Sequence, residues 1–178
     1  MKYFKTNITY ENKELTKKRT EQHPQRHQEA VREIAIAPTD EKFVTCSDDK
    51  TLKIWDFHTA SVDKTLEGHG SDVTTVDWHP SKSLIVSAGK DRVLKFWDPK
   101  NPKNFFNFQS NEHNNKHGME LCSLYNHTNT ITKVIFNNNG NWVLSCGRDQ
   151  VVKLFDLRVM KEICNFKSHS TEVICIFF

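Results

Sequence analysis

Three groups of polar residues in this sequence have the composition of a catalytic triad. In each group a histidine is followed by a hydroxyl-bearing residue 18 positions later and by an aspartate 22 positions later. A histidine between a hydroxyl and a carboxylate can activate the hydroxyl as a nucleophile, provided that an oxyanion hole lies beside it. The groups are His27, Thr45 and Asp49; His69, Ser87 and Asp91; and His127, Ser145 and Asp149.

The repetition of this group argues against catalysis. An active site needs one exposed nucleophile, whereas these residues recur in the same place in successive units. Ten positions after the hydroxyl stand Trp55 and Trp97, whose indole N–H can donate to it, while Phe155 of the third unit has no such donor. We expect a structural relay from Asp through His and hydroxyl to Trp, since a buried unpaired polar group costs about 1–3 kcal/mol. The sequence therefore predicts no enzyme, no cofactor and no small-molecule substrate.

A second cluster has residue types that could bind a metal. His113 and His117 are spaced as zinc ligands on a helix would be, and Cys122 follows them. The stretch around them is rich in Asn, His and Lys, which is typical of a turn-prone loop. Cys122 fits a strand, so no metal site is predicted. The cysteines contain no Cys-x2-Cys pair and are expected to be reduced thiols, mostly buried in strands: Cys46, Cys122, Cys146, Cys164 and Cys175.

A basic stretch near the start is the candidate for contact with RNA phosphates. It contains Lys17, Lys18 and Arg19, whose charges would add salt-dependent affinity that is blind to sequence. The stretch has no interleaved aromatic residues on which bases could stack. A solvated charged loop is therefore the preferred interpretation of this segment, with phosphate contact as the alternative.

The composition is that of a folded, soluble protein. Hydrophobic residues make up 37% and charged residues 26% of the chain, and a formal charge of +3 permits a nucleic-acid partner without indicating one. No apolar run is long enough to cross a bilayer, and the first residues do not begin a signal peptide. We expect an intracellular protein without a membrane partner.

The elements that must position these residues repeat along the chain. The histidines His27, His69, His127 and His169 lie 42, 58 and 42 residues apart. Each is followed by apolar residues four, seven and nine positions later. In the three full units a turn, a second apolar run and a third run ending in aromatic-Asp come next. A 42-residue unit with Trp-Asp endings is typical of a four-stranded propeller blade. The sequence predicts an all-β, WD-repeat β-propeller fragment with three complete blades and partial blades at both ends.

The order of these units can be stated along the chain. The 16 extra residues of the middle unit fall within residues 101–118, which we interpret as an insertion between its third and fourth strands. Three blades cannot close a ring, so we expect apolar faces at both ends and a chain that is a fragment or is completed by another polypeptide. The predicted order is 1–8, partial strands of a preceding blade; 9–26, a basic insertion loop; 27–68, a blade; 69–126, a blade with the insertion; 127–168, a blade; and 169–178, the start of a further blade.

Several strings within these units are more specific than a generic WD repeat. They include Val76-Asp-Trp-His-Pro, Lys95-Phe-Trp-Asp-Pro-Lys, Asn139-Gly-Asn-Trp and Lys153-Leu-Phe-Asp-Leu-Arg. From about His27 to Val173 the chain resembles the WD-repeat subunit of the cleavage and polyadenylation specificity factor.

The resemblance implies a seven-bladed scaffold in the nucleus. Its partners would be other subunits of the cleavage and polyadenylation complex, and in that family it helps to hold the AAUAAA signal of pre-mRNA. Much of the family's RNA contact comes from a basic segment and early blades that precede this stretch. No RNA-binding residue is therefore carried over to this chain.

Two other classes of function remain as alternatives. A generic WD-repeat adaptor in ubiquitin ligation or signalling would use the same fold without RNA, because fold alone does not determine function. A propeller enzyme would need a unique cluster of acid, base and nucleophile, which the repeated groups do not provide.

Overall fold

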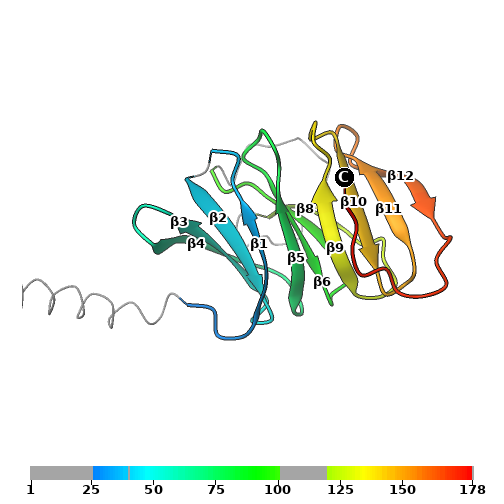
Figure 1. The fold of residues 1–178 in the computed structure, drawn as a ribbon, viewed down its shortest axis with the longest axis horizontal. Coiled ribbons are helices and arrows are strands. Elements are labelled where there is room, and N and C mark those ends of the chain that lie inside the picture. Colours follow the sequence, from blue (N-terminus) through cyan, green and yellow to red (C-terminus); the bar gives the residue numbers. More distant parts are fainter. Residues whose placement is uncertain (1–25, 40, 101–119, 178) are drawn as a thin grey trace, which may run out of the picture.

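The computed structural model describes residues 26–39, 41–100 and 120–177 (Figure 1). In this part the chain forms twelve strands and no helix, arranged as three four-stranded antiparallel sheets. The predicted all-β fold with three complete four-stranded blades is confirmed. Blade one contains β1 (Val31–Ile36), β2 (Lys42–Ser47), β3 (Thr51–Asp56) and β4 (Ser61–Glu67); blade two contains β5 (Val73–Trp78), β6 (Ile85–Gly89), β7 (Leu94–Trp97) and β8 (Glu120–Leu124); blade three contains β9 (Ile131–Phe136), β10 (Trp142–Gly147), β11 (Val152–Asp156) and β12 (Lys161–Phe166).

The first strands of the three blades lie side by side in the middle of the molecule, and the later strands fan outward (Figure 1). These inner strands belong to different sheets, so no backbone ladder joins them. Side chains of the inner strands join neighbouring blades instead. Three of them each accept a hydrogen bond from a backbone N–H of the following blade. The bonds are Val76 N to Glu33 Oε2 (3.1 Å), Val134 N to Thr75 Oγ1 (3.1 Å) and Phe136 N to Asp77 Oδ2 (2.7 Å).

A β-bulge near the start of each blade explains the uneven spacing of its apolar residues. In blade two the pairing of β5 with β6 shifts between Val73 and Thr75. The extra residue reverses the alternation of side chains, so Val73 and Val76 share a buried face although they are three positions apart. The same shift occurs near the start of β1 and opposite the start of β9.

The hydrophobic core lies between the blades. One cluster joins residues of blade one to β5, β6 and β7 of blade two, and a second joins blade two to blade three. Representative members of the first are Val44, Ile54, Leu66, Ile85 and Trp97, and of the second Val86, Phe96, Val134, Val143 and Phe155. Each sheet therefore depends on its neighbour for burial.

Among the described residues the outward face of blade one is exposed, as was expected for the end of an open row of blades. Val31, Ile34 and Ile36 are 51%, 56% and 55% exposed, whereas the corresponding Val73 and Val76 of blade two are buried. The residues of blade two are covered by blade one. Nothing among the described residues covers the same side of blade one, because that side faces away from blade two.

The expected strand at Val173–Phe178 is not formed by the described residues of that segment. The segment nevertheless continues the contacts between inner strands. Thr132 Oγ1 of blade three donates to the carbonyl of Val173, just as Thr74 Oγ1 of blade two donates to that of Ile131 at 2.5 Å. A strand needs a paired neighbour, and the described residues offer none here. That this segment starts a further blade remains a prediction.

The segment predicted as an insertion of the middle unit separates two paired strands of blade two. Strand β7 ends at Trp97 and β8 begins at Glu120, so residues 101–118 lie between the third and fourth strands of blade two. These residues themselves, the predicted segment 1–8, and residues 9–25 of the predicted insertion loop 9–26 lie outside the described part of the chain.

A buried histidine locks the turn after β5 to the turn after β9. His79 Nδ1 accepts the backbone N–H groups of Ser81 (3.1 Å) and Lys82 (3.0 Å), so the ring proton is on Nε2. Nε2 then donates to the carbonyl of Gly140 at 3.0 Å. Gly140 has a φ of +73°, and a Cβ at this position would lie 2.3 Å from two atoms of the His79 ring. The lock therefore requires glycine.

Replacing Gly140 with alanine tests this lock. We expect Gly140→Ala to lower the free energy of unfolding by about 2–4 kcal/mol, because the methyl group collides with the ring and the left-handed backbone is strained. Gly70→Ala is the matched control, since its Cβ would meet only Asp91 Cβ at an ordinary 3.8 Å. Urea denaturation measures both changes, and equal stability of the two variants would contradict the proposed lock.

Candidate functional site

Each predicted His–Asp–hydroxyl group is assembled in the structure within one blade. In the three groups His Nδ1 lies 2.7–2.8 Å from the Asp Oδ2, and His Nε2 lies 2.6–2.7 Å from the hydroxyl oxygen. Trp55 Nε1 and Trp97 Nε1 donate to Thr45 and Ser87, each at 2.8 Å. In blade three Phe155 stands in the place of the tryptophan, so that chain of hydrogen bonds ends at Ser145.

The direction of the hydrogen bonds follows from their chemistry. The Asp oxygen that faces the histidine also accepts a backbone N–H, from Gln28, Gly70 or Thr128, at 3.0 Å in each blade. It acts as an ionised acceptor, so His Nδ1 carries a proton and Nε2 accepts the hydroxyl proton. The hydroxyl oxygen in turn accepts the indole N–H where a tryptophan is present.

The environment of the relay supports these charge states. Burial alone would raise the pKa of Asp49, but hydrogen bonds from Thr51, His27 and the backbone lower it to about 2. The pKa of Asp91 is also lowered: burial opposes the charge, and the bond from His69 outweighs it together with other hydrogen bonds. Burial lowers the pKa of His127. The lowered pKa values of Asp49, Asp91 and His127 match the hydrogen-bond pattern.

The relay hydroxyls are poorly placed for catalysis. Ser87 and Ser145 have no exposed surface, and each is already hydrogen bonded to its histidine. A nucleophile must reach its substrate, and these side chains cannot do so without unfolding the turn. The geometry instead ties the turn between the second and third strands to the loop that precedes the first strand.

The turns held by the relay display charged side chains at one end of the blades. Directly after each relay Asp, the residues Lys50, Arg92 and Gln150 have left-handed φ values of 68°, 66° and 67° and are exposed. Ion pairs lie beside them: Arg32 with Asp48, Lys90 with Asp72, and Arg148 with Glu172. We call this surface the relay rim. Its charges have both signs, which suits a protein partner of complementary pattern.

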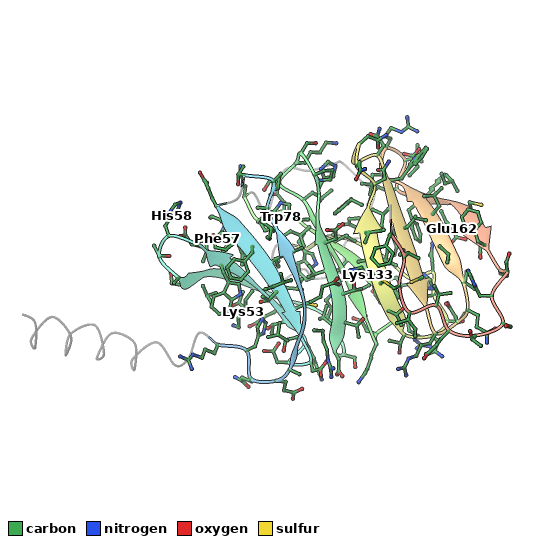
Figure 2. The ribbon with its side chains drawn as sticks, viewed as in Figure 1. Lys53, Phe57, His58, Trp78, Lys133 and Glu162 are labelled. Atoms are coloured by element: carbon green, nitrogen blue, oxygen red, sulfur yellow. The ribbon has the colours of Figure 1, made fainter. Side chains whose placement is uncertain are left out.

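Three buried lysines were not assigned a role from the sequence. Lys53, Lys95 and Lys153 pair directly opposite the relay hydroxyls in the strand register. Their ammonium groups bond to the fourth strand, at Thr65 Oγ1 (3.1 Å), Ser123 Oγ (3.0 Å) and Glu162 Oε2 (2.8 Å). Lys53 and Glu162 are labelled in Figure 2. The sequence did contain a signal for this role, because a lysine stands two positions before the third-strand aromatic residue of every unit.

An ion pair between blades one and three was also not foreseen. Lys133 of β9, labelled in Figure 2, pairs with Glu33 of β1, although 100 residues separate them. Glu33 also accepts the backbone N–H of Val76 and so links all three blades. Residues this far apart meet because the three inner strands run side by side.

The other site residues considered above have different outcomes. Lys17, Lys18, Arg19, His113 and His117 lie outside the described residues. Within the described ranges, no group of three or more His, Cys, Asp or Glu is placed to hold a metal ion. In the same ranges, no helix is long and apolar enough to cross a membrane.

The cysteines fit the expectation in part. Cys46 and Cys146 are buried free thiols in β2 and β10, and burial raises the pKa of Cys46 to about 12. Cys164 is half-buried, and Cys122 lies in β8. Cys175 is exposed, contrary to expectation, because its segment forms no strand with a covered face.

Comparison with known protein families agrees with the geometry of the blades. The family described as WD40, "WD domain, G-beta repeat", matches residues 18–56, 60–98 and 118–156. Each match ends on the Asp that closes a third strand. The chain belongs to the WD40-repeat family. In this WD40 chain the aspartates Asp56, Asp98 and Asp156 accept backbone N–H groups of the following turn at 2.7–2.9 Å.

Individual relatives of this WD40 chain fall into several groups. It is 45% identical over 89 residues to "Polyadenylation factor subunit 2" of Neurospora crassa and 41% identical over 85 residues to that of Gibberella zeae. These matches cover 50% and 48% of the chain and 11% of each relative. It is 26% identical over 161 residues to "Nuclear distribution protein PAC1" of Arthroderma benhamiae, which covers 85% of the chain and 32% of that relative. The chain thus spans about a tenth to a third of the length of these relatives.

Removing the relay hydroxyl should have different effects in blades two and three. Ser87→Ala leaves two buried partners unpaired, His69 Nε2 and Trp97 Nε1, whereas Ser145→Ala leaves only His127 Nε2. We expect losses of stability of about 2–3 and about 1–1.5 kcal/mol respectively. In the Ser87→Ala background, Trp97→Phe should be less destabilising than in the natural sequence. Urea denaturation of the four variants measures this difference, and additive effects would argue against a connected relay.

Stability should fall as the pH is lowered through the range of histidine titration. Burial lowers the pKa values of His79 and His127 from the ordinary 6.5, so the unfolded chain binds protons at a higher pH than the folded chain. By linkage, the free energy of unfolding decreases below about pH 6.5. The lowered pKa of Asp49, about 2, adds a loss only at more acidic pH. Urea midpoints between about pH 7.5 and about pH 5.5 test this, and His79→Gln should weaken the dependence. A midpoint that stays constant or rises on acidification would overturn it.

Proposed function

We propose that this chain is a non-catalytic scaffold of the nuclear machinery that cleaves and polyadenylates pre-mRNA. The observation that carries the proposal is the 45% identity to a polyadenylation factor subunit over half of the chain. That identity exceeds the 26% to a nuclear distribution protein over a longer stretch. The sequence strings around Trp78, Trp97 and Phe155 point to the same family.

The geometry of the blades supports a scaffold rather than an enzyme. The triad-like groups are buried and serve the turns, as the relay bonds of Ser87 and Ser145 illustrate. The relay rim carries paired charges of both signs on rigid turns. Such a surface can give specificity and register to a protein complex. The partners proposed are other subunits of the cleavage and polyadenylation complex, with no small-molecule substrate and no cofactor.

Contact with pre-mRNA is proposed through neighbouring regions of the assembly rather than through the described blades. The relay rim places Asp48, Asp72 and Glu172 beside its basic residues, and these anions would repel a phosphate backbone. Lys17, Lys18 and Arg19 remain the candidates within this chain for contact with RNA phosphates.

A generic WD-repeat adaptor is the second candidate function. It is favoured by the breadth of the match to PAC1, which covers 85% of the chain at lower identity. The two candidates differ in location, because the polyadenylation scaffold would work in the nucleus. Cell fractionation separates them, and an entirely cytoplasmic protein would support the adaptor.

Affinity purification tests the leading proposal. The tagged full chain, recovered from nuclei of its own source, should bring down cleavage and polyadenylation factors, as identified by mass spectrometry. The tag alone is the control for background binding. Recovery of the folded chain without any of these factors would refute the proposal.

A further inference from the structure

The junction between blades one and two contains a cavity. Its volume is about 160 Å³, and its apolar lining includes Ala37 of blade one with Trp78 and Pro99 of blade two. It opens at the end of the blades opposite the relay rim, between the turns that follow β1, β5 and β7. Trp78 is labelled in Figure 2.

The repeat explains the space beside Trp78. Ala37 follows its relay histidine by ten positions, and His79 follows its own by the same number. At the junction of blades two and three the His79 ring fills this place and packs edge-on against Phe136, with ring centroids 5.1 Å apart. Phe136 corresponds to Trp78. Alanine in place of histidine therefore leaves the space of one ring beside Trp78.

One polar group in the lining of this cavity lacks a hydrogen-bond partner within the described part of the chain, and two cationic side chains lie beside it. Ser83 Oγ, in its lining, is buried and has no hydrogen-bond partner among the residues that the structure describes. Lys82 and Lys100 also line the cavity, and both are exposed. A buried hydroxyl without a partner is unusual in a native protein and is consistent with a site that a ligand completes.

The walls of the cavity are held in place by bonds of their own. Lys42 pairs with Asp63 at 2.8 Å, and Lys64 of blade one donates to the carbonyl of Pro99 of blade two at 2.5 Å. The lining contains a second acidic residue, Glu41, on the side of blade one. The cationic side is therefore that of blade two.

We propose that this cavity, the inter-blade pocket, binds a protein segment that inserts one aromatic side chain beside Trp78. The inserted ring takes the place that His79 fills at the next junction. Acidic residues flanking the ring meet Lys82 and Lys100 at the mouth of the pocket. The partner is thus an acidic linear segment with a single aromatic anchor.

The His79–Gly140 pair at the junction of blades two and three is the template for the decisive variant. Ala37→His together with Lys82→Gly reproduces the pair His79 and Gly140 and so fills the pocket with a ring. The glycine is needed because a Cβ at Gly140 would collide with the His79 ring. Lys82→Gly alone is the matched control, since it removes the same charge and leaves the pocket open.

The probe is a fluorescein-labelled peptide, Asp-Glu-Phe-Glu-Asp, titrated with the purified full chain and followed by fluorescence anisotropy. Replacing Phe with Ser in the peptide should weaken binding by about tenfold or more, because one buried aromatic side chain is lost. Replacing all four acidic residues with Lys should weaken it as well. The filled-pocket double variant should bind at least about tenfold more weakly than Lys82→Gly alone.

Three results would overturn the proposal. They are no binding of the Phe peptide by the natural chain, equal binding of the Phe and Ser peptides, and equal binding by the double variant and its control. A cooperative urea transition for each variant shows that the comparison is made between folded proteins. The test uses purified protein, so its result is independent of whether the chain acts in polyadenylation.

Discussion

Burial of each sheet by the next one is the constraint on which this structure depends. A four-stranded blade has two faces and too few residues to form a core of its own, so its apolar side chains are covered only by its neighbours. Blade two shows the complete arrangement: its Val73 and Val76 pack toward blade one, and its Val86 and Phe96 pack toward blade three. Blade one shows the same design with one neighbour absent from the described residues, and there Ile34 and Ile36 are exposed.

The relays serve this arrangement by fixing the turn between the second and third strands of each blade. Aspartate, histidine and hydroxyl join the turn after the second strand to the loop before the first strand through a buried path in which every proton has an acceptor. The same residue types in an enzyme would surround an accessible nucleophile. Here the hydroxyls are buried at the strands, and exposure is left to the turn residues that follow each Asp. Rigid turns that present charges are the property a scaffold needs, because a preorganised surface loses less entropy when a partner binds.

Small differences between equivalent positions then give each junction its own character. Histidine at position 79 fills its junction and requires Gly140, whereas Ala37 leaves an open pocket beside Trp78. Phe155 in place of a tryptophan shortens the third relay. Because the blades repeat, a residue that differs in one blade can be compared with the equivalent residue of the neighbouring blade. Both the lock at His79 and the inter-blade pocket follow from that comparison.

The spacing of residues within one repeat was sufficient to predict a large part of this protein's fold. The relay groups, the four-stranded units and the place of the insertion in blade two all follow from positions counted within one repeat, because hydrogen-bonded turns and strand alternation are local properties. Burial was decided by tertiary structure. Val31 and Val73 have the same place in the repeat, yet only Val73 is covered, since coverage depends on the next sheet. The pair of Glu33 with Lys133 and the contact of His79 with Gly140 likewise join different blades, and only the side-by-side arrangement of the inner strands brings such residues together.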